Sequence, residues 1–279
     1  MNRTAILLLA SLALLSAGCE KLKSRDRLNK GLQAYRNARY TDAAEFFKES
    51  VALDPKNENG RLYLATAYMA QYIPGAVSPE NNQMAKAAKD EFMKVLIDHP
   101  KDKIALASLA SLAYNQATGV PELEKKFERL NEAKDWYQKL VEADPQSKEG
   151  FYSLGVIDWL KTYPVRNTAR VKLGMKPEDP GPIKDKKVKE ELRQRNLPLV
   201  EDGLKDLQKA LEIDPNYDDA MAYMNLLYRE RADLAETVDG YKKDSDTADQ
   251  WVQKSLDTKK KNGAKAAAAA AGGINPDAK

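Results

Sequence analysis

Hydrophobic and polar residues alternate along most of the chain with a spacing of three to four positions, which places the apolar side chains on one face of a helix. Four segments share this spacing and end alike, at residues 43–55, 88–100, 133–145 and 203–215. Each begins with a small residue, carries an aromatic or apolar residue four positions later, and ends in a proline. Because proline cannot continue a helix, each segment is predicted to be an amphipathic helix that stops at its proline.

A second amphipathic segment precedes each of these four. The preceding segments span residues 28–40, 62–72, 106–116 and 151–160. A fifth segment, 220–234, pairs with 248–256. The pairs predict an all-α fold of about five helical hairpins. No single hairpin buries its apolar face alone, so stacked hairpins are expected to share a core.

The hairpins resemble tetratricopeptide repeats (TPRs), whose pattern places Leu beside Gly or Ala on the first helix, Ala on the second, and Pro at its end. The matching residues are Gly31, Ala43, Phe47, Pro55, Leu64, Ala65, Tyr68, Ala88, Phe92, Pro100, Leu109, Ala110, Ala133, Tyr137, Pro145, Leu154, Gly155, Gly203 and Pro215. The resemblance covers roughly residues 24–258. It implies an α-solenoid that binds a protein or peptide in a concave groove.

The repeats are longer than the family period of about 34 residues. Successive prolines lie 45, 45 and 70 residues apart, which leaves 11, 11 and 36 extra residues. Eleven residues make about three helical turns, so they can lengthen a helix without rotating its apolar face. We expect a long helix over 121–143, but an irregular loop over 71–80 with Ser78 and Pro79 opening the next helix.

The largest insertion, residues 161–200, is basic. It holds seven Lys and four Arg against five Asp and Glu, a net charge of 11 − 5 = +6 in a chain of +3. We expect an irregular stretch over 175–182, a short helix over 184–196 and a break at Pro198. The insertion is interpreted as a solvated surface, a dock for an acidic protein or polyanionic envelope polymer, or a nucleic-acid patch. Tyr163 is its only aromatic residue, which disfavours nucleic acid.

The chain after Thr258 has a different composition. Residues 259–279 lack large apolar side chains apart from Ile274, so they are predicted to form a low-complexity, disordered tail. The six alanines after Lys265 favour transient helix, and a solvated terminal cap is the alternative.

The N-terminus has the layout of a secretory signal. Arg3 precedes an apolar run over residues 5–15, and small residues lead to Cys19, the only cysteine. This layout resembles a bacterial lipoprotein signal, which implies removal of residues 1–18 and acylation of Cys19. The alternative is an uncleaved N-terminal anchor.

Two residues refine this prediction. Ser16 stands where the lipoprotein family usually has leucine. Glu20 follows the cysteine where Asp would imply retention at the inner membrane, so the resemblance implies the periplasmic face of the outer membrane.

The sequence offers little that indicates catalysis, a cofactor or a metal site. The one histidine, His99, falls at a predicted helix end, and no glycine-rich phosphate loop is present. The acidic runs at 215–220 and 243–249 are interpreted as helix starts. A net charge of +3 is small beside a charged fraction of 31%, so general attraction to polyanions is expected to be weak. We therefore predict no enzyme, no cofactor and no metal.

The predicted groove is lined by the first helix of each hairpin. Counting from the matched positions places these residues near it: Tyr35, Arg36, Leu62, Met69, Tyr114, Tyr152, Trp159, Tyr223, Leu226 and Arg229. Aromatic rings with arginines suit a peptide that has apolar anchors, although any single tyrosine can instead serve helix packing. The carboxylate clamp of chaperone-binding repeats is not supported, because Tyr63, Ile104 and Ser108 occupy its places. The main hypothesis is a lipid-anchored, non-catalytic scaffold that binds an unidentified envelope protein or peptide.

Overall fold

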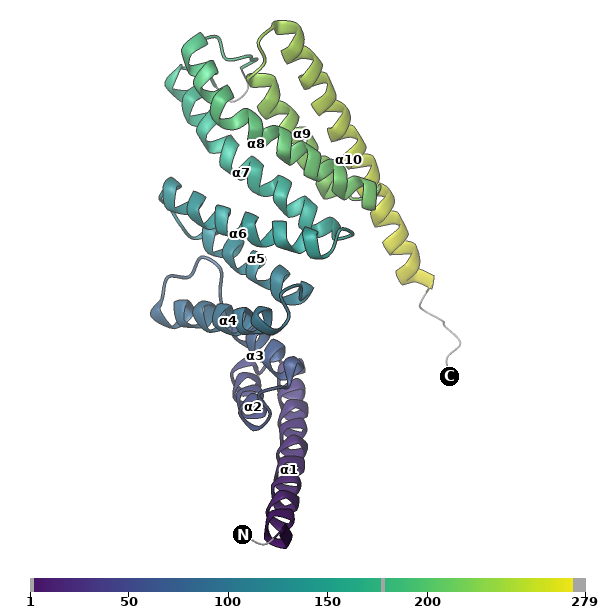
Figure 1. The fold of residues 1–279 in the computed structure, drawn as a ribbon. Coiled ribbons are helices and arrows are strands. Elements are labelled where there is room, and N and C mark those ends of the chain that lie inside the picture. The colour runs from purple at the N-terminus through teal and green to yellow at the C-terminus, as the bar shows by residue number, and fades with distance from the viewer. Residues whose placement is uncertain (1–2, 177–178, 273–279) are drawn as a thin grey trace. The chain divides into compact units, whose positions relative to one another are not determined.

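The computed structural model describes the backbone of residues 3–176 and 179–272, with side chains from Cys19 to Ala268 apart from residues 177–178. Ten helices and no strand are found within those residues (Figure 1). The chain divides into two compact units, Met1–Lys139 and Leu140–Lys279, and each is described by itself. The predicted signal, residues 1–18, lies outside the residues whose side chains are described. No helix among the described residues is both long and apolar enough to cross a membrane.

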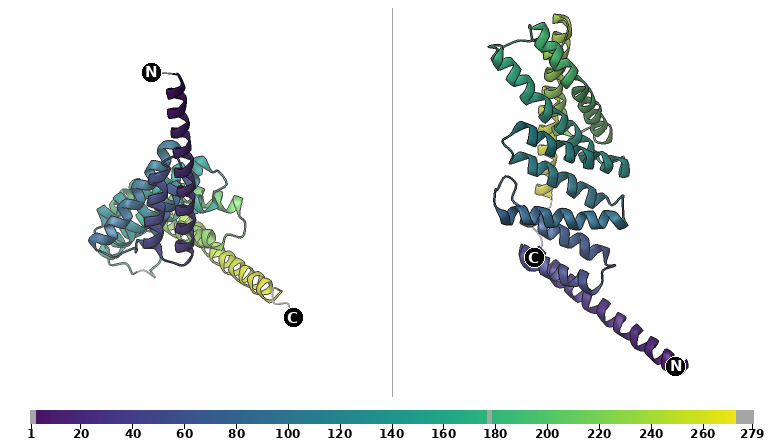
Figure 2. Two further views of the ribbon diagram at one scale, coloured as in Figure 1. Left: turned by 90° about the horizontal axis from the view of Figure 1, so that it is seen from below. Right: turned by 60° about the vertical axis from the view of Figure 1, so that its left-hand side comes forward.

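The first unit consists of antiparallel hairpins that follow one another along the chain (Figure 2). Its helices are α1 (Arg3–Arg36), α2 (Tyr40–Leu53), α3 (Glu58–Gln71), α4 (Pro79–Asp98), α5 (Lys103–Thr118) and α6 (Leu123–Ala143), the last of which runs past the unit boundary. The predicted long helix over 121–143 is confirmed by α6. The predicted loop over 71–80 is also confirmed, with Ser78 capping α4.

Side-chain caps explain where many helices begin. The side chain of Asn57 accepts a hydrogen bond from the Gly60 amide at 3.1 Å, and Asp102 accepts one from Ala105 at 2.8 Å. Such caps satisfy amides that have no partner within the helix. The same device starts helices at Ser78, Ser147 and Asp185. Each cap therefore fixes the point at which a new helix turns back on the preceding one.

Close approach between the helices of a hairpin depends on small residues. A Cβ added to Gly31 would lie 2.5 Å from two ring carbons of Phe47, so this site accepts only glycine without rearrangement. Phe47 is fully buried between α1 and α2, and Phe92 has the same role in the second hairpin. The TPR-like pairing of a small residue with a large one is thus present as predicted.

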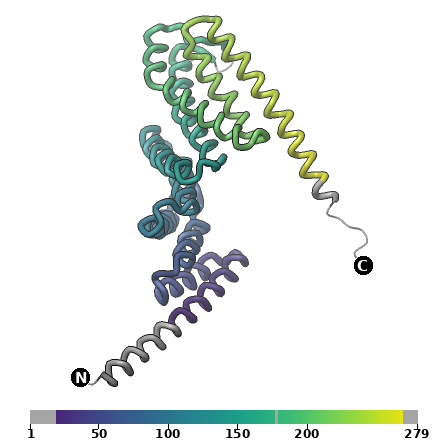
Figure 3. Tube along the Cα trace, turned by 45° about the vertical axis from the view of Figure 1, so that its right-hand side comes forward, coloured from purple at the N-terminus to yellow at the C-terminus, as the bar shows by residue number. Residues whose placement is uncertain are grey.

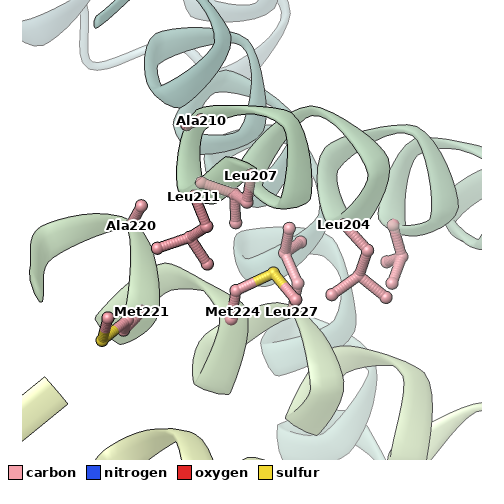
Figure 4. Close-up of a cluster of buried hydrophobic side chains, with 9 residues drawn as sticks. Leu204, Leu207, Ala210, Leu211, Ala220, Met221, Met224 and Leu227 are labelled. Carbon is pink, nitrogen blue, oxygen red and sulfur yellow. The ribbon is translucent and has the colours of Figure 1, made fainter. Parts of the chain in front are cut away.

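The second unit contains the end of α6 and α7 (Lys148–Lys172), α8 (Lys186–Ile213), α9 (Asp218–Asp233) and α10 (Val238–Gly272). These last four helices lie alongside one another (Figure 3). Leucine and methionine side chains of α8 and α9 form their shared core (Figure 4). Gly155 on α7 and Gly203 on α8 let the two helices approach, since a Cβ on Gly155 would lie 3.0 Å from the Gly203 carbonyl oxygen.

The basic insertion is more helical than the sequence predicts. The expected end of the first helix at residue 160 and the break at Pro198 are both wrong, because α7 continues through Pro164 to Lys172 and α8 passes through Pro198. Near these prolines the two helices are held together by the buried Leu192 and by a hydrogen bond of 3.2 Å from Asn196 Nδ2 to the Thr162 carbonyl. Pro198 has no N–H group, so the Gln194 carbonyl lacks its usual helical donor. Both residues are exposed, so water can reach that carbonyl. The expected irregular stretch is confirmed for the described residues between α7 and α8.

The last hairpin also differs from the prediction. Residues 243–249 do not start a helix, because α10 begins at Val238, where the Thr237 hydroxyl accepts a hydrogen bond from the Gly240 amide. The extra residues before Ala248 lengthen this helix at its beginning. The acidic run thus lies along the side of a helix that is already formed.

The structure differs from the predicted disordered tail at residues 259–272, which continue α10 as helix. Lysine and alanine favour helix in this stretch. The side-chain amide of Asn262 also donates to the Asn216 carbonyl and to Asp218 Oδ1, both at 3.0 Å, and so fastens α10 to the start of α9. Residues 273–279 lie outside the described residues.

Candidate functional site

Five aromatic rings of the second unit form one continuous row. In order they are Tyr217, Tyr152, Tyr223, Trp159 and Tyr163, and successive ring centroids lie 5.1, 5.6, 5.6 and 5.0 Å apart. These separations are within the range in which aromatic pairs attract each other. We call this set the aromatic row.

Helical spacing brings the row together. Tyr152 and Trp159 are seven residues apart on α7, about two turns, and Tyr163 follows one turn later. Tyr223 projects from α9 between Tyr152 and Trp159, in edge contact with both rings. Tyr217, the residue before α9, extends the row past Tyr152. Two antiparallel hairpins therefore contribute to one surface.

Most of the rings are held by the core and are still partly exposed. Four of them pack against the α8–α9 core and remain partly exposed, and the Tyr163 side of the row is the most open, with 39% of that residue exposed. Burial, followed by the nearby carboxylates of Glu149 and Asp219, raises the pKa of Tyr217 to about 12. The charged phenolate is therefore disfavoured at this site, and at neutral pH the phenol has a proton to donate, as in any tyrosine.

A cation lies over the ring at each end of the row. Lys148 Nζ is 5.0 Å from the centroid of Tyr217, and Arg166 Cζ is 5.6 Å from that of Tyr163. Both cations are already paired within the protein. Lys148 contacts Asp214 at 2.6 Å, a hydrogen bond that raises the pKa of Lys148, whereas Arg166 contacts Glu230 at 2.8 Å.

A buried ionic network holds Arg166 in place. Arg166 and Arg170 on α7 both pair with Asp233 on α9, at 2.5 and 2.8 Å. Arg170 Nη2 also donates to the carbonyls of Lys176 and Asp179 at 2.8 and 2.6 Å, which ties the loop after α7 to the same site. Burial disfavours the charged guanidinium of Arg166, but its carboxylate partners outweigh that effect and raise its pKa. The insertion is therefore fastened to α9, and Tyr163 with it.

The sequence located three members of the row and missed two. Tyr152, Trp159 and Tyr223 were predicted to line the groove, and the structure brings them together. Tyr163 was assigned to the insertion and Tyr217 to a helix start. The spacing of seven and then four residues from Tyr152 to Tyr163 was the available signal, and it applies only if the helix continues past residue 160 to Tyr163.

The other predicted groove residues of the second unit lie outside the row. Arg229 is exposed and directs its guanidinium to Asp249 on α10 at 2.7 Å and to Asn225 at 2.8 Å. Leu226 is partly buried on α9. Their roles in binding stay predictions.

In the first unit the predicted groove residues belong to separate packing contacts. Tyr35 packs around Phe47 and meets Tyr40 edge-on at 5.1 Å, whereas Leu62 and Met69 pack on the cluster around Phe92. Tyr114 is partly buried, which raises its pKa, and Arg36 is exposed. The structure does not join these residues into a row, and their part in binding also stays a prediction.

Little in the described residues points to catalysis. His99 Nε2 lies 2.9 Å from Glu58 Oε1 at the end of α4, a pairing on the surface of the first unit. Within the described ranges, no three or more His, Cys, Asp or Glu residues are grouped in a way that could hold a metal ion.

Comparisons with known proteins bear on the fold alone. No protein-family model matches the chain, and no curated protein matches it in sequence. Among solved structures, a crystal structure of MamA is 13% identical, with 86% of this chain and 94% of that chain covered and a TM-score of 0.50. MamA from Desulfovibrio magneticus RS-1 is 16% identical, with 86% and 96% covered and a TM-score of 0.50. YrrB, described as a TPR protein with an unusual peptide-binding site, is 17% identical, with 83% and 84% covered and a TM-score of 0.46. The chain has the fold of a TPR-like α-solenoid.

Proposed function

We propose that this protein is a lipid-anchored, non-catalytic scaffold of the bacterial envelope that binds a protein or peptide partner on the aromatic row. The observation that carries the proposal is the continuity of five rings, four of which pack on the α8–α9 core and remain partly exposed. Tyrosine and tryptophan are the residues most enriched where binding energy concentrates in protein interfaces.

The row is suited to binding because its rings are held before a partner arrives. Four of them pack on the α8–α9 core, so little rotamer freedom remains to be lost on association. The tyrosine hydroxyls can direct a partner's backbone by hydrogen bonding, while the ring faces accept apolar side chains. An apolar or aromatic side chain of the partner is the expected anchor.

The charges around the row indicate that the partner need not be acidic. Lys148 and Arg166 are neutralised by Asp214 and by Glu230 with Asp233. An acidic ligand would have to compete with these internal partners. We therefore expect binding to depend weakly on salt, as is usual where apolar contacts dominate.

The test is capture of partners from native membranes by the acylated protein, comparing Trp159→Ala with Trp251→Ala. Trp251 packs on the same core from α10 but is outside the row, so it is a matched control. Loss of a central aromatic anchor costs about 2 kcal/mol or more, roughly thirtyfold in affinity. The proposal requires one or more captured proteins to be lost with Trp159→Ala and retained with Trp251→Ala. An identical captured set for both variants would contradict it.

Membrane attachment rests on the signal-like N-terminus and on Cys19, which is exposed at the start of the described side chains. Replacing Cys19 with Ala and fractionating cells tests attachment, since the variant should leave the membrane fraction. Glu20→Asp tests the choice of membrane, because it should move the protein to the inner membrane. Unchanged fractionation of Cys19→Ala would remove the lipid from the proposal.

The alternative, a binder of polyanionic envelope polymer that uses the basic insertion, is less well supported. Arg166 and Arg170 serve the buried network, and Lys189 and Arg193 donate to the carbonyls of Ala235 and Leu234. Four of the eleven basic side chains of the insertion therefore hold it against α9 and the loop that follows α9. A steep loss of binding with rising salt would revive this alternative.

A further inference from the structure

The repeat domain begins very close to the predicted lipid attachment. Ser24, five residues after Cys19, is only 1% exposed. Its hydroxyl donates to the Ser50 carbonyl at 2.9 Å, and the Ser50 hydroxyl donates to the Ser24 carbonyl at 2.9 Å. These reciprocal bonds join α1 to the last turn of α2.

The connection between Cys19 and Ser24 is helical, because both residues lie in α1. At about 1.5 Å per residue, five residues span roughly 7.5 Å. The headgroup region on each side of a bilayer is of similar depth, about 5–8 Å. An acyl chain on Cys19 would therefore hold the first hairpin against the headgroups.

The surface beside this connection has an exposed apolar residue and a hollow. Leu22 is 71% exposed and lies almost opposite the buried Ser24 on the helix. A hollow of about 670 Å³ extends from it between the middle of α1 and the C-terminal end of α2. Its lining residues are Leu22, Lys23, Asp26, Arg27, Glu49, Ala52 and Leu53, and we call them the N-terminal face.

The hollow itself is balanced in charge, with Lys23 and Arg27 against Asp26 and Glu49, but the stretch of α1 beside it carries an excess of positive charge. From Cys19 to Lys30 there are five Lys and Arg against two Asp and Glu, a net of 5 − 2 = +3. Lys21, Lys23 and Arg25 are all exposed. Basic side chains around an exposed leucine suit an anionic bilayer surface, which attracts cations and accepts apolar side chains at the boundary between headgroups and acyl chains.

We propose that the N-terminal face, together with the basic residues Lys21 and Arg25 that flank Leu22 on α1, docks on the lipid headgroups of the membrane that holds the acylated Cys19. Leu22 enters the headgroup boundary, and Lys21, Lys23 and Arg25 contact anionic lipids. This inference rests on the proposed lipid anchor and adds to it that the first hairpin lies on the membrane rather than hanging from a flexible linker. The occupant of the face is the bilayer itself.

The experiment uses the acylated full chain in vesicles that contain anionic phospholipid and a lipid-borne quencher. Acylated Cys19 has no free thiol, so a cysteine introduced at another position is the only site for a fluorescent label. Ala52→Cys places the label on the N-terminal face, and Ala76→Cys places it on the exposed loop between α3 and α4 as a matched control. Flotation with the vesicles is measured on the same samples.

The expected result is flotation of both labelled proteins, with quenching at least twofold greater at residue 52 than at residue 76. Adding Leu22→Ser should reduce the quenching at residue 52 and leave flotation unchanged. Equal quenching at the two positions in protein that floats would overturn the docking and leave the lipid anchor intact. Failure to float would overturn the anchor and the docking together. The fluorescence of the label at residue 52 is also measured without vesicles as the protein concentration is raised. A change under these conditions would show that the face binds a second copy of the protein, and it would overturn the proposal.

Discussion

Removal of the Asp233 carboxylate should destabilise the second unit strongly. Asp233 accepts hydrogen bonds from Arg166 at 2.5 Å and from Arg170 at 2.8 and 3.0 Å. The side chains of Arg170 and Asp233 are only 3% and 7% exposed. Asp233→Ala therefore leaves the buried Arg170 without its carboxylate partner, whereas Arg166 keeps its pair with Glu230.

Breaking a buried pair in this way typically costs about 3–5 kcal/mol. For a unit of this size that corresponds to a fall in Tm of about 10–20 °C. Thermal and urea unfolding followed by circular dichroism measure the loss. Amide hydrogen exchange over residues 161–200 should show faster exchange at the same time, because the network fastens the insertion.

The control is Asp249→Ala, which breaks the exposed pair between Arg229 and Asp249 at 2.7 Å. Exposed pairs contribute about 0–1 kcal/mol, so this variant should unfold almost like the parent. If Asp233→Ala lost no more stability than Asp249→Ala, the network would not hold the insertion, and the account of how Tyr163 and Arg166 are positioned would fail.

Three further predictions concern stability and titration. Gly31→Ala should lower the free energy of unfolding in urea by about 1–3 kcal/mol, because its Cβ would lie 2.5 Å from the Phe47 ring. Gly263→Ala is the control and should be neutral or stabilising, because the space around Gly263 is open. Equal effects of the two substitutions would contradict the packing argument. Pro198→Ala should stabilise the protein by up to about 3 kcal/mol, because it restores a helical hydrogen bond in α8. A lower stability in urea unfolding would instead show that the proline is needed for the packing of α8. Tyr217 should ionise near pH 12 by absorbance at 295 nm, and Tyr217→Phe should remove that step. Since folding raises the pKa of Tyr217, its contribution to stability is complete below pH 10 and is lost as the pH rises through about 12.

The sequence predicted the hairpins because their signals are local. Helical periodicity, small residues such as Ala43 and Gly155, and prolines after each second helix all act within one repeat. The caps at Ser78 and Asp102 are likewise encoded within three residues. These features needed no knowledge of the rest of the chain.

The insertion could not be predicted in the same way, because its helices depend on tertiary contacts. Pro164 and Pro198 are local signals to stop, and they are overridden by burial of Thr162, Asn196 and Arg170 against neighbouring helices. For the same reason, three of the five rings of the aromatic row were predicted and two were not. Tyr152 and Trp159 follow the repeat pattern, whereas Tyr163 joins them because α7 continues beyond the predicted end at residue 160.

The lengthening of α7 and α8 separates the size of the binding surface from the number of repeats, two properties that usually change together in solenoids. A repeat protein normally gains binding surface by adding repeats, and each addition also changes its cooperativity of folding. Here α7 gains three turns beyond residue 160 within one hairpin, and the turns carry Tyr163 and Arg166 onto the end of an existing row. Because about eleven residues return a helix to the same phase, such growth comes in fixed steps. The length of this binding surface can therefore change in increments of about eleven residues while the number of repeats stays constant.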